Sequence, residues 1–121
     1  MTQSISVFVC DDDPAQRFLL GQLMREQRGL YPAGAASSAI AAVRAIEEAR
    51  PDVVVLDHLD HEGDVSVMVR AIRQAVPDVR IVLHSGLPVE RIQGAETVDR
   101  YVRKTDLADP LWATIYELCD R

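Results

Sequence analysis

The chain has 121 residues, of which 48% are hydrophobic and 26% charged, and its formal net charge is -6. This length lies near the commonest domain size and the composition is that of a globular protein, so we expect one domain over residues 1–121 and exclude disorder. No apolar stretch reaches the roughly 20 residues that span a bilayer and no signal-peptide pattern is present, so we expect a cytoplasmic protein without membrane contact. The acidic balance without a basic tract argues against direct binding to nucleic acid.

The first part of the chain predicts a strand, a helix and an edge strand. The apolar run Ile5 to Cys10 is the strand, and three aspartates follow it. Asp13 followed by Pro14 is typical of a helix start, with the aspartate as cap and the proline at the first helical position. Gly29 ends this helix, and the run Leu30 to Ala36 suits only an edge strand because it contains proline and glycine. The buried stripe expected on the helix consists of Ala15, Leu19, Leu20, Leu23 and Met24.

The middle of the chain predicts a helix, a central strand and another helix. Ser37 or Ser38 caps the first of these helices, and Asp64 caps the second. The run Val53 to Leu56 is continuously apolar, as in a parallel strand covered by helices on both faces. The apolar faces expected on the two helices are Ala39, Ile40, Val43 and Ile46 for the first and Val65, Met68, Val69, Ile72 and Val76 for the second.

The last part predicts two strands and a final helix. Arg80 to His84 is the fourth strand and Tyr101 to Arg103 the fifth. Between them we expect at best a short helix from Pro88 to Gln93, because Gly94 stops it. Asp109 followed by proline repeats the cap and helix start, with Leu111, Ile115 and Leu118 aligned on one face. Five alternating units predict an α/β fold, a doubly wound five-stranded parallel sheet with right-handed crossovers.

In such a sheet the functional crevice lies beyond the carboxyl ends of the strands. Asp11 and Asp12 end the first strand, Asp57 the third, Ser85 the fourth and Lys104, the chain's single lysine, the fifth. Carboxylates held together repel, by about 4 kcal/mol for two charges ~4 Å apart at an effective dielectric of 20. A hard divalent cation with oxygen ligands, above all Mg2+, would compensate for this repulsion. Lys104 alone would compensate for the repulsion less well. The remaining alternative is that the carboxylates have raised pKa values.

Four short motifs follow one another along the chain. They are Val9 to Pro14 with its acidic pair, Pro51 to Asp57 with its apolar strand and final aspartate, Ile81 to Gly86 with its hydroxyl, and Tyr101 to Lys104 with an aromatic three residues before the lysine. In this order and spacing they resemble the receiver domain of bacterial two-component response regulators, over nearly the whole chain. The resemblance implies a stand-alone receiver with the flavodoxin-like strand order 2-1-3-4-5.

The resemblance also implies a phosphorylation switch that uses Mg2+. Asp57 would be the nucleophile that accepts a phosphoryl group from a sensor histidine kinase or a histidine phosphotransfer protein. Asp12, Asp57 and the backbone carbonyl of Leu59 would bind Mg2+ directly, and Asp11 would act mainly through a bound water. Such a protein is a phosphoacceptor that assists its own phosphorylation and dephosphorylation. Its output is contact with another protein, which the sequence does not identify.

Three further residues receive roles from the resemblance, each with a simpler alternative. Lys104 would neutralise charge on the transferring phosphoryl oxygens, together with the metal. Ser85 would donate a hydrogen bond to the attached phosphoryl group, although a serine after a strand commonly bonds local backbone. Tyr101 would swing inward as Ser85 moves, although a tyrosine there is often a core residue. Asp13 is expected to be a helix cap and not a ligand.

The chain departs from the family pattern in its loops. Thr105 follows Lys104 where the family usually has proline, which puts the aim of the lysine in question. His61 stands where proline commonly follows the acceptor by four residues, and Gly63 comes early, which indicates a shortened loop. The fourth helix of the family pattern is shortened in this chain, between Pro88 and Gly94. Because the surface of helix four, strand five and helix five commonly carries the output in this family, we expect an unusual partner geometry.

Other functions remain open at this point. His58, His61 and His84 beside carboxylates would suit a transition metal, although loop histidines are more often solvated or paired. A dehalogenase-type phosphatase also uses a strand-end aspartate but needs a second aspartate where Leu59 stands. For flavin or dinucleotide binding, the chain lacks the glycine-rich or hydroxyl-rich phosphate loop that would be needed after the first strand. The rival from a different class is a binding module that keeps the receiver fold but is not switched by phosphate.

Overall fold

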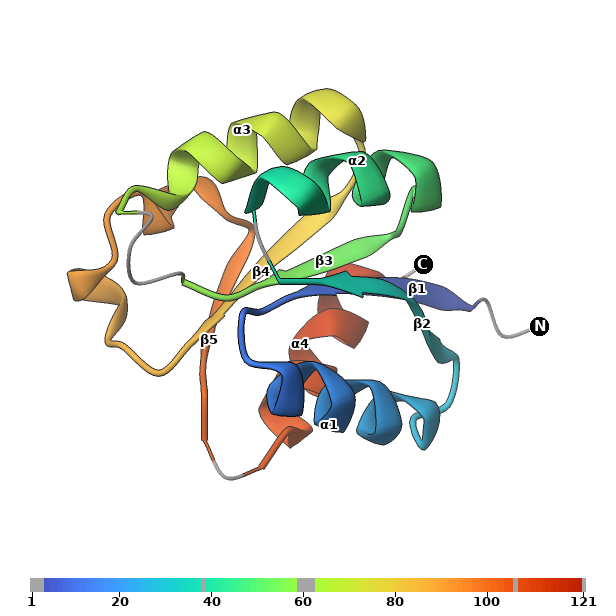
Figure 1. Cartoon of the computed structure of the whole chain (residues 1–121). Helices are drawn as coiled ribbons and strands as arrows, with labels where there is room; N and C mark the ends of the chain where they lie inside the picture. The colour runs from blue at the N-terminus through green and yellow to red at the C-terminus, as the bar shows by residue number, and fades with distance from the viewer. Residues whose placement is uncertain (1–3, 38, 59–62, 106, 121) are drawn as a thin grey trace.

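The computed structural model describes residues 4–37, 39–58, 63–105 and 107–120, and these residues contain a five-stranded sheet between two layers of helices (Figure 1). The strand order is β2-β1-β3-β4-β5 and all neighbouring strands are parallel, which confirms the predicted doubly wound α/β fold. The strands are β1 (Ile5–Cys10), β2 (Leu30–Ala36), β3 (Val53–Leu56), β4 (Arg80–Ser85) and β5 (Arg100–Arg103).

The helices divide between the two faces of the sheet. α1 (Pro14–Arg25) and α4 (Asp109–Leu118) cover one face, and α2 (Ala39–Ala49) and α3 (Val65–Ala75) cover the other (Figure 1). Each described helix is too short or too polar to cross a membrane.

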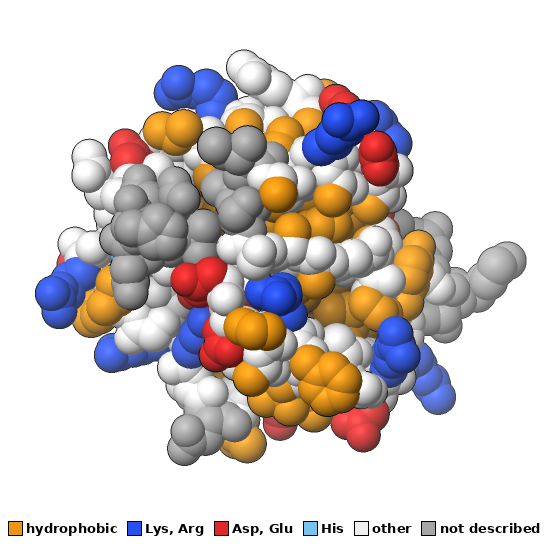
Figure 2. All heavy atoms as spheres, viewed as in Figure 1, with side chains coloured by type: hydrophobic (Ala, Val, Ile, Leu, Met, Phe, Trp, Pro, Cys, Tyr) orange, Lys and Arg blue, Asp and Glu red, His pale blue; other side chains and the backbone are white. Residues whose placement is uncertain are grey.

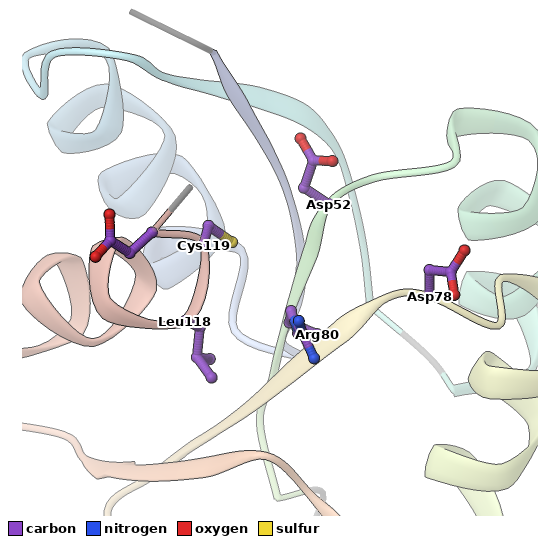
Figure 3. Close-up of a pocket in the computed structure, with 6 residues that line it drawn as sticks. Asp52, Asp78, Arg80, Leu118 and Cys119 are labelled. Carbon is purple, nitrogen blue, oxygen red and sulfur yellow. The ribbon is translucent and has the colours of Figure 1, made fainter.

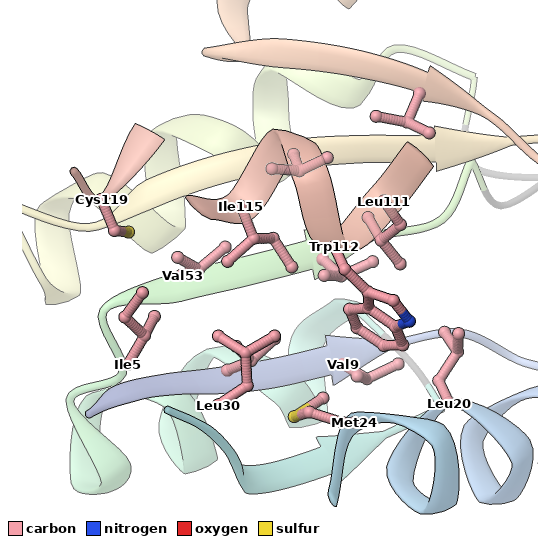
Figure 4. Packing of buried hydrophobic residues seen from close by; sticks show 14 residues of the cluster. Ile5, Val9, Leu20, Met24, Leu30, Val53, Leu111, Trp112, Ile115 and Cys119 are labelled. Carbon is pink, nitrogen blue, oxygen red and sulfur yellow. The ribbon is translucent and has the colours of Figure 1, made fainter. Parts of the chain in front are cut away.

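Each face of the sheet has its own buried cluster. On the α1 and α4 side, strand valines pack against Leu20 and Met24 of α1 and against Trp112 and Ile115 of α4 (Figure 4). On the other side, Phe8 and its neighbours in the sheet pack against α2 and α3. β1 and β3 are buried along their whole length, as expected for strands covered on both faces. These two central strands therefore hold the residues that follow them in fixed positions.

The predicted caps are correct for α1 and α3 and wrong for α4. Asp13 and Asp64 each accept the backbone N–H two residues further on, at 3.0 and 2.9 Å. The sequence predicts Asp109 as the cap of α4, but Asp109 is the first helical residue and Ala108 stands at the cap without a side-chain hydrogen bond. Proline fits either of the first two helical positions, because neither backbone N–H has a partner within the helix.

α1 buries a narrower face than the sequence predicts. Leu20 and Met24 are buried, whereas Ala15 is exposed and Leu19 is 50% exposed. Since successive helical residues are about 100° apart, Leu19 turns away from the sheet when Leu20 faces it. Phe18 is 69% exposed, and Figure 2 shows apolar side chains gathered over α1. The predicted stripe therefore belongs partly to the outer surface.

The connection between β4 and β5 contains two 3-10 helices where a fourth α-helix would be expected. These are η1 (Val89–Arg91) and η2 (Ala95–Thr97), and Gly94 between them has a φ of 84°. The shortening of this helix, predicted from Pro88 and Gly94, is thus confirmed within the described residues. The buried side chains of this connection form a third cluster with α3 and β4, here called the α3–η cluster, which consists of Val65, Leu83, Ile92 and Ala95.

Candidate functional site

The polar residues selected from the sequence meet at the carboxyl ends of the strands. Asp11 and Asp12 follow β1, Asp57 follows β3, Ser85 ends β4 and Lys104 follows β5. Asp11, Asp57 and Ser85 are buried, with 2%, 9% and 2% of their surface exposed. Burial of polar side chains is costly unless they have partners, so their concentration at one edge marks a built site. A hollow at this edge is lined by Asp12, Asp57, His58, Ser85, Gly86, Leu87 and Lys104.

The ammonium group of Lys104 binds two carboxylates. Its Nζ lies 2.9 Å from Oδ2 of Asp11 and 2.9 Å from Oδ1 of Asp57. Burial alone would lower the pKa of Lys104, but these two hydrogen-bonded carboxylates outweigh it and raise the pKa above its ordinary value. The peptide bond to Thr105 is trans, and the backbone N–H of Lys104 donates to the carbonyl of Ser85 at 2.7 Å. The lysine therefore reaches the carboxylates without a following proline.

Three carboxylates form a cluster with suitable spacing for a cation. Asp11, Asp12 and Asp57 each offer an oxygen, and these oxygens lie within 4.8 Å of one another. Both oxygens of Asp11 already have donors, since Oδ1 accepts the N–H of Asp13 and Oδ2 accepts Lys104. Asp12, in contrast, is exposed at the rim. A set of carboxylate oxygens fits a hard ion such as Mg2+; Leu59, whose carbonyl was predicted as a further ligand, lies outside the described residues.

The environment of Asp57 disfavours its charged form. Burial raises the pKa of Asp57 from 3.8 to about 6; hydrogen bonding to Lys104 opposes the increase, and the charges of Asp11 and Asp12 add to it. A carboxylate nucleophile must be deprotonated. A cation bound among these oxygens would favour the charged form and thereby the nucleophile.

The hydroxyl of Ser85 and the ring of Tyr101 are joined through the backbone of Leu87. Oγ of Ser85 accepts the N–H of Leu87 at 3.1 Å, and the hydroxyl of Tyr101 donates to the carbonyl of Leu87. The local backbone bond anticipated for Ser85 is therefore present, yet it uses only the acceptor side and leaves the hydroxyl hydrogen to donate into the hollow. Sequence reasoning missed Leu87, because its contribution comes from backbone atoms that every residue type carries.

His58 and His84, the two histidines that the structure describes, do not belong to the carboxylate cluster. Among the described residues, the cluster able to hold a metal contains aspartates alone, and His61 lies outside them. His84 lies in β4, as predicted for the fourth strand, and is buried with 5% of its surface exposed. Burial, together with the charge of Lys104, lowers the pKa of His84 to about 4, against a smaller opposing effect of Asp11. Its imidazole is therefore neutral at pH 7, and its position on the same side of β4 as Val82 could have indicated this burial.

A second hollow lies at the opposite edge of the sheet and is lined by Asp52, Asp78, Arg80, Leu118, Cys119 and Asp120 (Figure 3). Asp52 has a structural role there, because Oδ2 accepts both the N–H and the hydroxyl of Ser6, at 2.9 and 3.3 Å. Its backbone N–H donates to Oγ of Ser6 at 3.0 Å, which ties the starts of β1 and β3 together. We assign this hollow to the architecture of the sheet.

Comparisons with known proteins agree with this geometry. A family model described as Response regulator receiver domain matches residues 7–104. None of the curated proteins matches the chain significantly.

Solved structures give the same result for the fold. A two-component response regulator of the LuxR family from an Aurantimonas species is 25% identical, covers 96% of this chain and 85% of its own, and has a TM-score of 0.83. The response regulator TrrA of Thermotoga maritima, in complex with Mg2+-BeF, is 24% identical over 98% of this chain and 99% of its own, with a TM-score of 0.80. A complex of the histidine kinase ThkA with TrrA matches with 23% identity, coverage of 99% and 100%, and a TM-score of 0.81. The last two likenesses bear on the fold alone.

Proposed function

This chain belongs to the response regulator receiver domain family, and from that premise we propose that it is a phosphorylation switch in which Asp57 accepts the phosphoryl group. The observation that carries the proposal is the arrangement around Lys104, whose ammonium contacts both Asp57 and Asp11 at 2.9 Å in a cluster of three carboxylates. If Lys104 had only a structural role, a single carboxylate beside it would be enough. Three carboxylates and a buried hydroxyl around one lysine provide the groups that phosphoryl transfer needs.

In the proposed reaction a carboxylate oxygen of Asp57 attacks the phosphorus of a phosphohistidine. A P–O bond forms, the P–N bond breaks, and the histidine nitrogen leaves with the electron pair of that bond. The donor is a sensor histidine kinase or a histidine phosphotransfer protein. Membership of the receiver domain family supports this class of donor, and TrrA, which shares the fold, has been solved in complex with the histidine kinase ThkA. In this proposal the chain assists its own phosphorylation and dephosphorylation.

The residues around Asp57 stabilise the charge that develops during transfer. Lys104 is held beside Asp57 and places its positive charge next to the incoming phosphoryl oxygens. Asp12, Asp57 and the Leu59 carbonyl would hold Mg2+, with Asp11 acting through a bound water, and the ion would supply further positive charge to these oxygens. The indirect role of Asp11 is supported by its two oxygens, each of which already accepts a hydrogen bond.

Phosphoacceptor chemistry at Asp57 is tested by mass spectrometry. Incubation of the wild-type protein with acetyl phosphate and Mg2+ is expected to add the mass of one phosphoryl group, and Asp57→Asn is expected to add none. Asp13→Asn is the matched control, because Asp13 is an exposed cap and asparagine caps equally well. Equal labelling of wild type and Asp57→Asn would overturn the assignment, and absence of labelling and of beryllofluoride binding in wild type would favour the unswitched binding module.

Ser85 is proposed to transmit the phosphoryl state toward Tyr101. Its hydroxyl hydrogen can bond a phosphoryl oxygen, and its Oγ already accepts the backbone N–H of Leu87, whose carbonyl accepts the hydroxyl of Tyr101. If the gain is a typical 1 to 3 kcal/mol, the active population shifts about 5-fold to 150-fold. Ser85→Ala is therefore expected to bind beryllofluoride at Asp57 yet to give much smaller amide shift changes over residues 86 to 118. Changes as large as those of wild type would show that the hydroxyl does not transmit the signal.

A further inference from the structure

The start of α3 is fastened to the connection between β4 and β5. The backbone N–H of Val65 donates to the carbonyl of Gln93 at 3.0 Å. Gly94, with a φ of 84°, lies directly against the helix cap, because a Cβ at this position would come within 2.1 Å of Oδ1 of Asp64 and 2.7 Å of the backbone nitrogen of Ser66. Only glycine combines this backbone conformation with so close an approach. We call these contacts the front clip.

The later part of α3 is fastened to the same connection by Arg73. Its guanidinium donates to the carbonyl of Thr97 at 3.3 Å and pairs with Oδ2 of Asp99 at 3.1 Å. It also donates to the carbonyl of Val79 at 3.1 Å, while Oδ2 of Asp99 accepts the N–H of Ile81 at 2.7 Å. We call these contacts the rear clip. One arginine thus joins α3, η2 and the start of β4.

Both fastened elements pack on the residues that would sense phosphorylation. The α3–η cluster contains Val65 from the first position of α3 and Ile92 and Ala95 from the connection. Leu87 and Tyr101 pack against the same cluster. A displacement of the Leu87 peptide or of the Tyr101 ring therefore acts on α3 and on the connection through shared contacts, and close-packed interiors transmit such displacements.

From these contacts we propose that α3 and residues 88–99 respond to phosphorylation of Asp57 as one unit. The inference rests on the proposed function. The front and rear clips join both ends of α3 to the connection between β4 and β5, so this connection cannot move independently of α3. A helix at this place without such contacts could. The unit presents a shallow groove between α3 and η2, lined by Ser66, Val69, Arg70, Arg73, Gln74 and Thr97.

The experiment measures amide chemical shifts with and without beryllofluoride and Mg2+ in wild type and in variants of each clip. In wild type, we expect changes at Gly86 and Leu87 beside Asp57 and also at residues 65–75 of α3. In Arg73→Gln and in Gly94→Ala, the changes in α3 are expected to fall at least twofold, while those at Gly86 and Leu87 persist. Arg70→Gln is the matched control, since it makes the same substitution one turn earlier on α3 and leaves both clips intact.

The outcomes separate this inference from the proposed function. Changes beside Asp57 without changes in α3 of the wild type, or α3 changes of wild-type size in Arg73→Gln, overturn the inference alone. No changes anywhere in wild type overturn the proposed function and the inference with it. Gly94→Ala places a side chain in a strained position and could fail to fold. In that case Arg73→Gln decides the question, because the Arg73 side chain is 33% exposed and its replacement does not open the core.

Discussion

Asp57→Asn is expected to raise the free energy of unfolding of the metal-free protein at pH 7 to 8 by roughly 2 to 3 kcal/mol. This is the free-energy equivalent of the rise in the pKa of Asp57 from 3.8 to about 6. The substitution removes a carboxylate whose charged form is disfavoured by burial and by the neighbouring aspartates, and asparagine is close to it in shape. A mutation at the most important residue of the site would therefore make the fold more stable. This is the expected sign for a site that keeps a buried charge for its chemistry.

The pH dependence of this effect follows from the pKa of about 6 in the folded protein and 3.8 in the unfolded chain. Below the lower value the carboxyl group is protonated in both states, so wild type and Asp57→Asn should have equal stability. As the pH rises toward 6 the unfolded chain loses its proton first, and wild type loses stability relative to the variant. Above the higher value the difference is constant.

Urea unfolding in the presence of a chelator measures this difference between pH 4 and pH 8. Trp112 is a suitable fluorescence probe because it is 3% exposed in the folded protein. Asp13→Asn is the control, since it makes the same substitution at an exposed position. A stability difference between wild type and Asp57→Asn that does not change with pH would contradict the assigned cause.

The fold and the meeting of the site residues could be predicted because both depend on where the strands end. The bounds of β1, β2 and β3 coincide with the runs predicted from the sequence, and β1 and β3 each end where an apolar run meets aspartate. Once parallel strands are placed, the residue after each carboxyl end is brought to one edge. Asp11, Asp57, Ser85 and Lys104 needed no further information to be placed together.

Other features depend on contacts that a local pattern does not contain. The helical spacing of Leu19 is compatible with burial, yet the orientation of α1 is set by the sheet, and Leu19 is exposed. Gly94 could be recognised as a helix stop, but its approach to Asp64 depends on two elements far apart in the sequence. The link from Ser85 to Tyr101 uses backbone atoms of Leu87. These contacts come from tertiary packing.

Asp12→Ala is expected to weaken Mg2+ binding at least tenfold, about 1.4 kcal/mol, because Asp12 is the carboxylate of the cluster that is exposed at the rim and able to reach the ion directly. Asp13→Ala is the matched control on the next residue. It should leave the Mg2+ affinity nearly unchanged and cost about 1 kcal/mol of folding stability, because the Asp13 carboxylate caps α1.

Titration calorimetry with Mg2+ and urea unfolding of both variants separate ligation from capping. The two substitutions remove the same chemical group from adjacent positions, so a general loss of negative charge would weaken Mg2+ binding by similar factors. Ligation by Asp12 instead predicts that affinity falls in one variant and stability in the other. Equal affinities would refute the ranking of the two aspartates, and would direct attention to Asp11, which would have to exchange Lys104 for the ion.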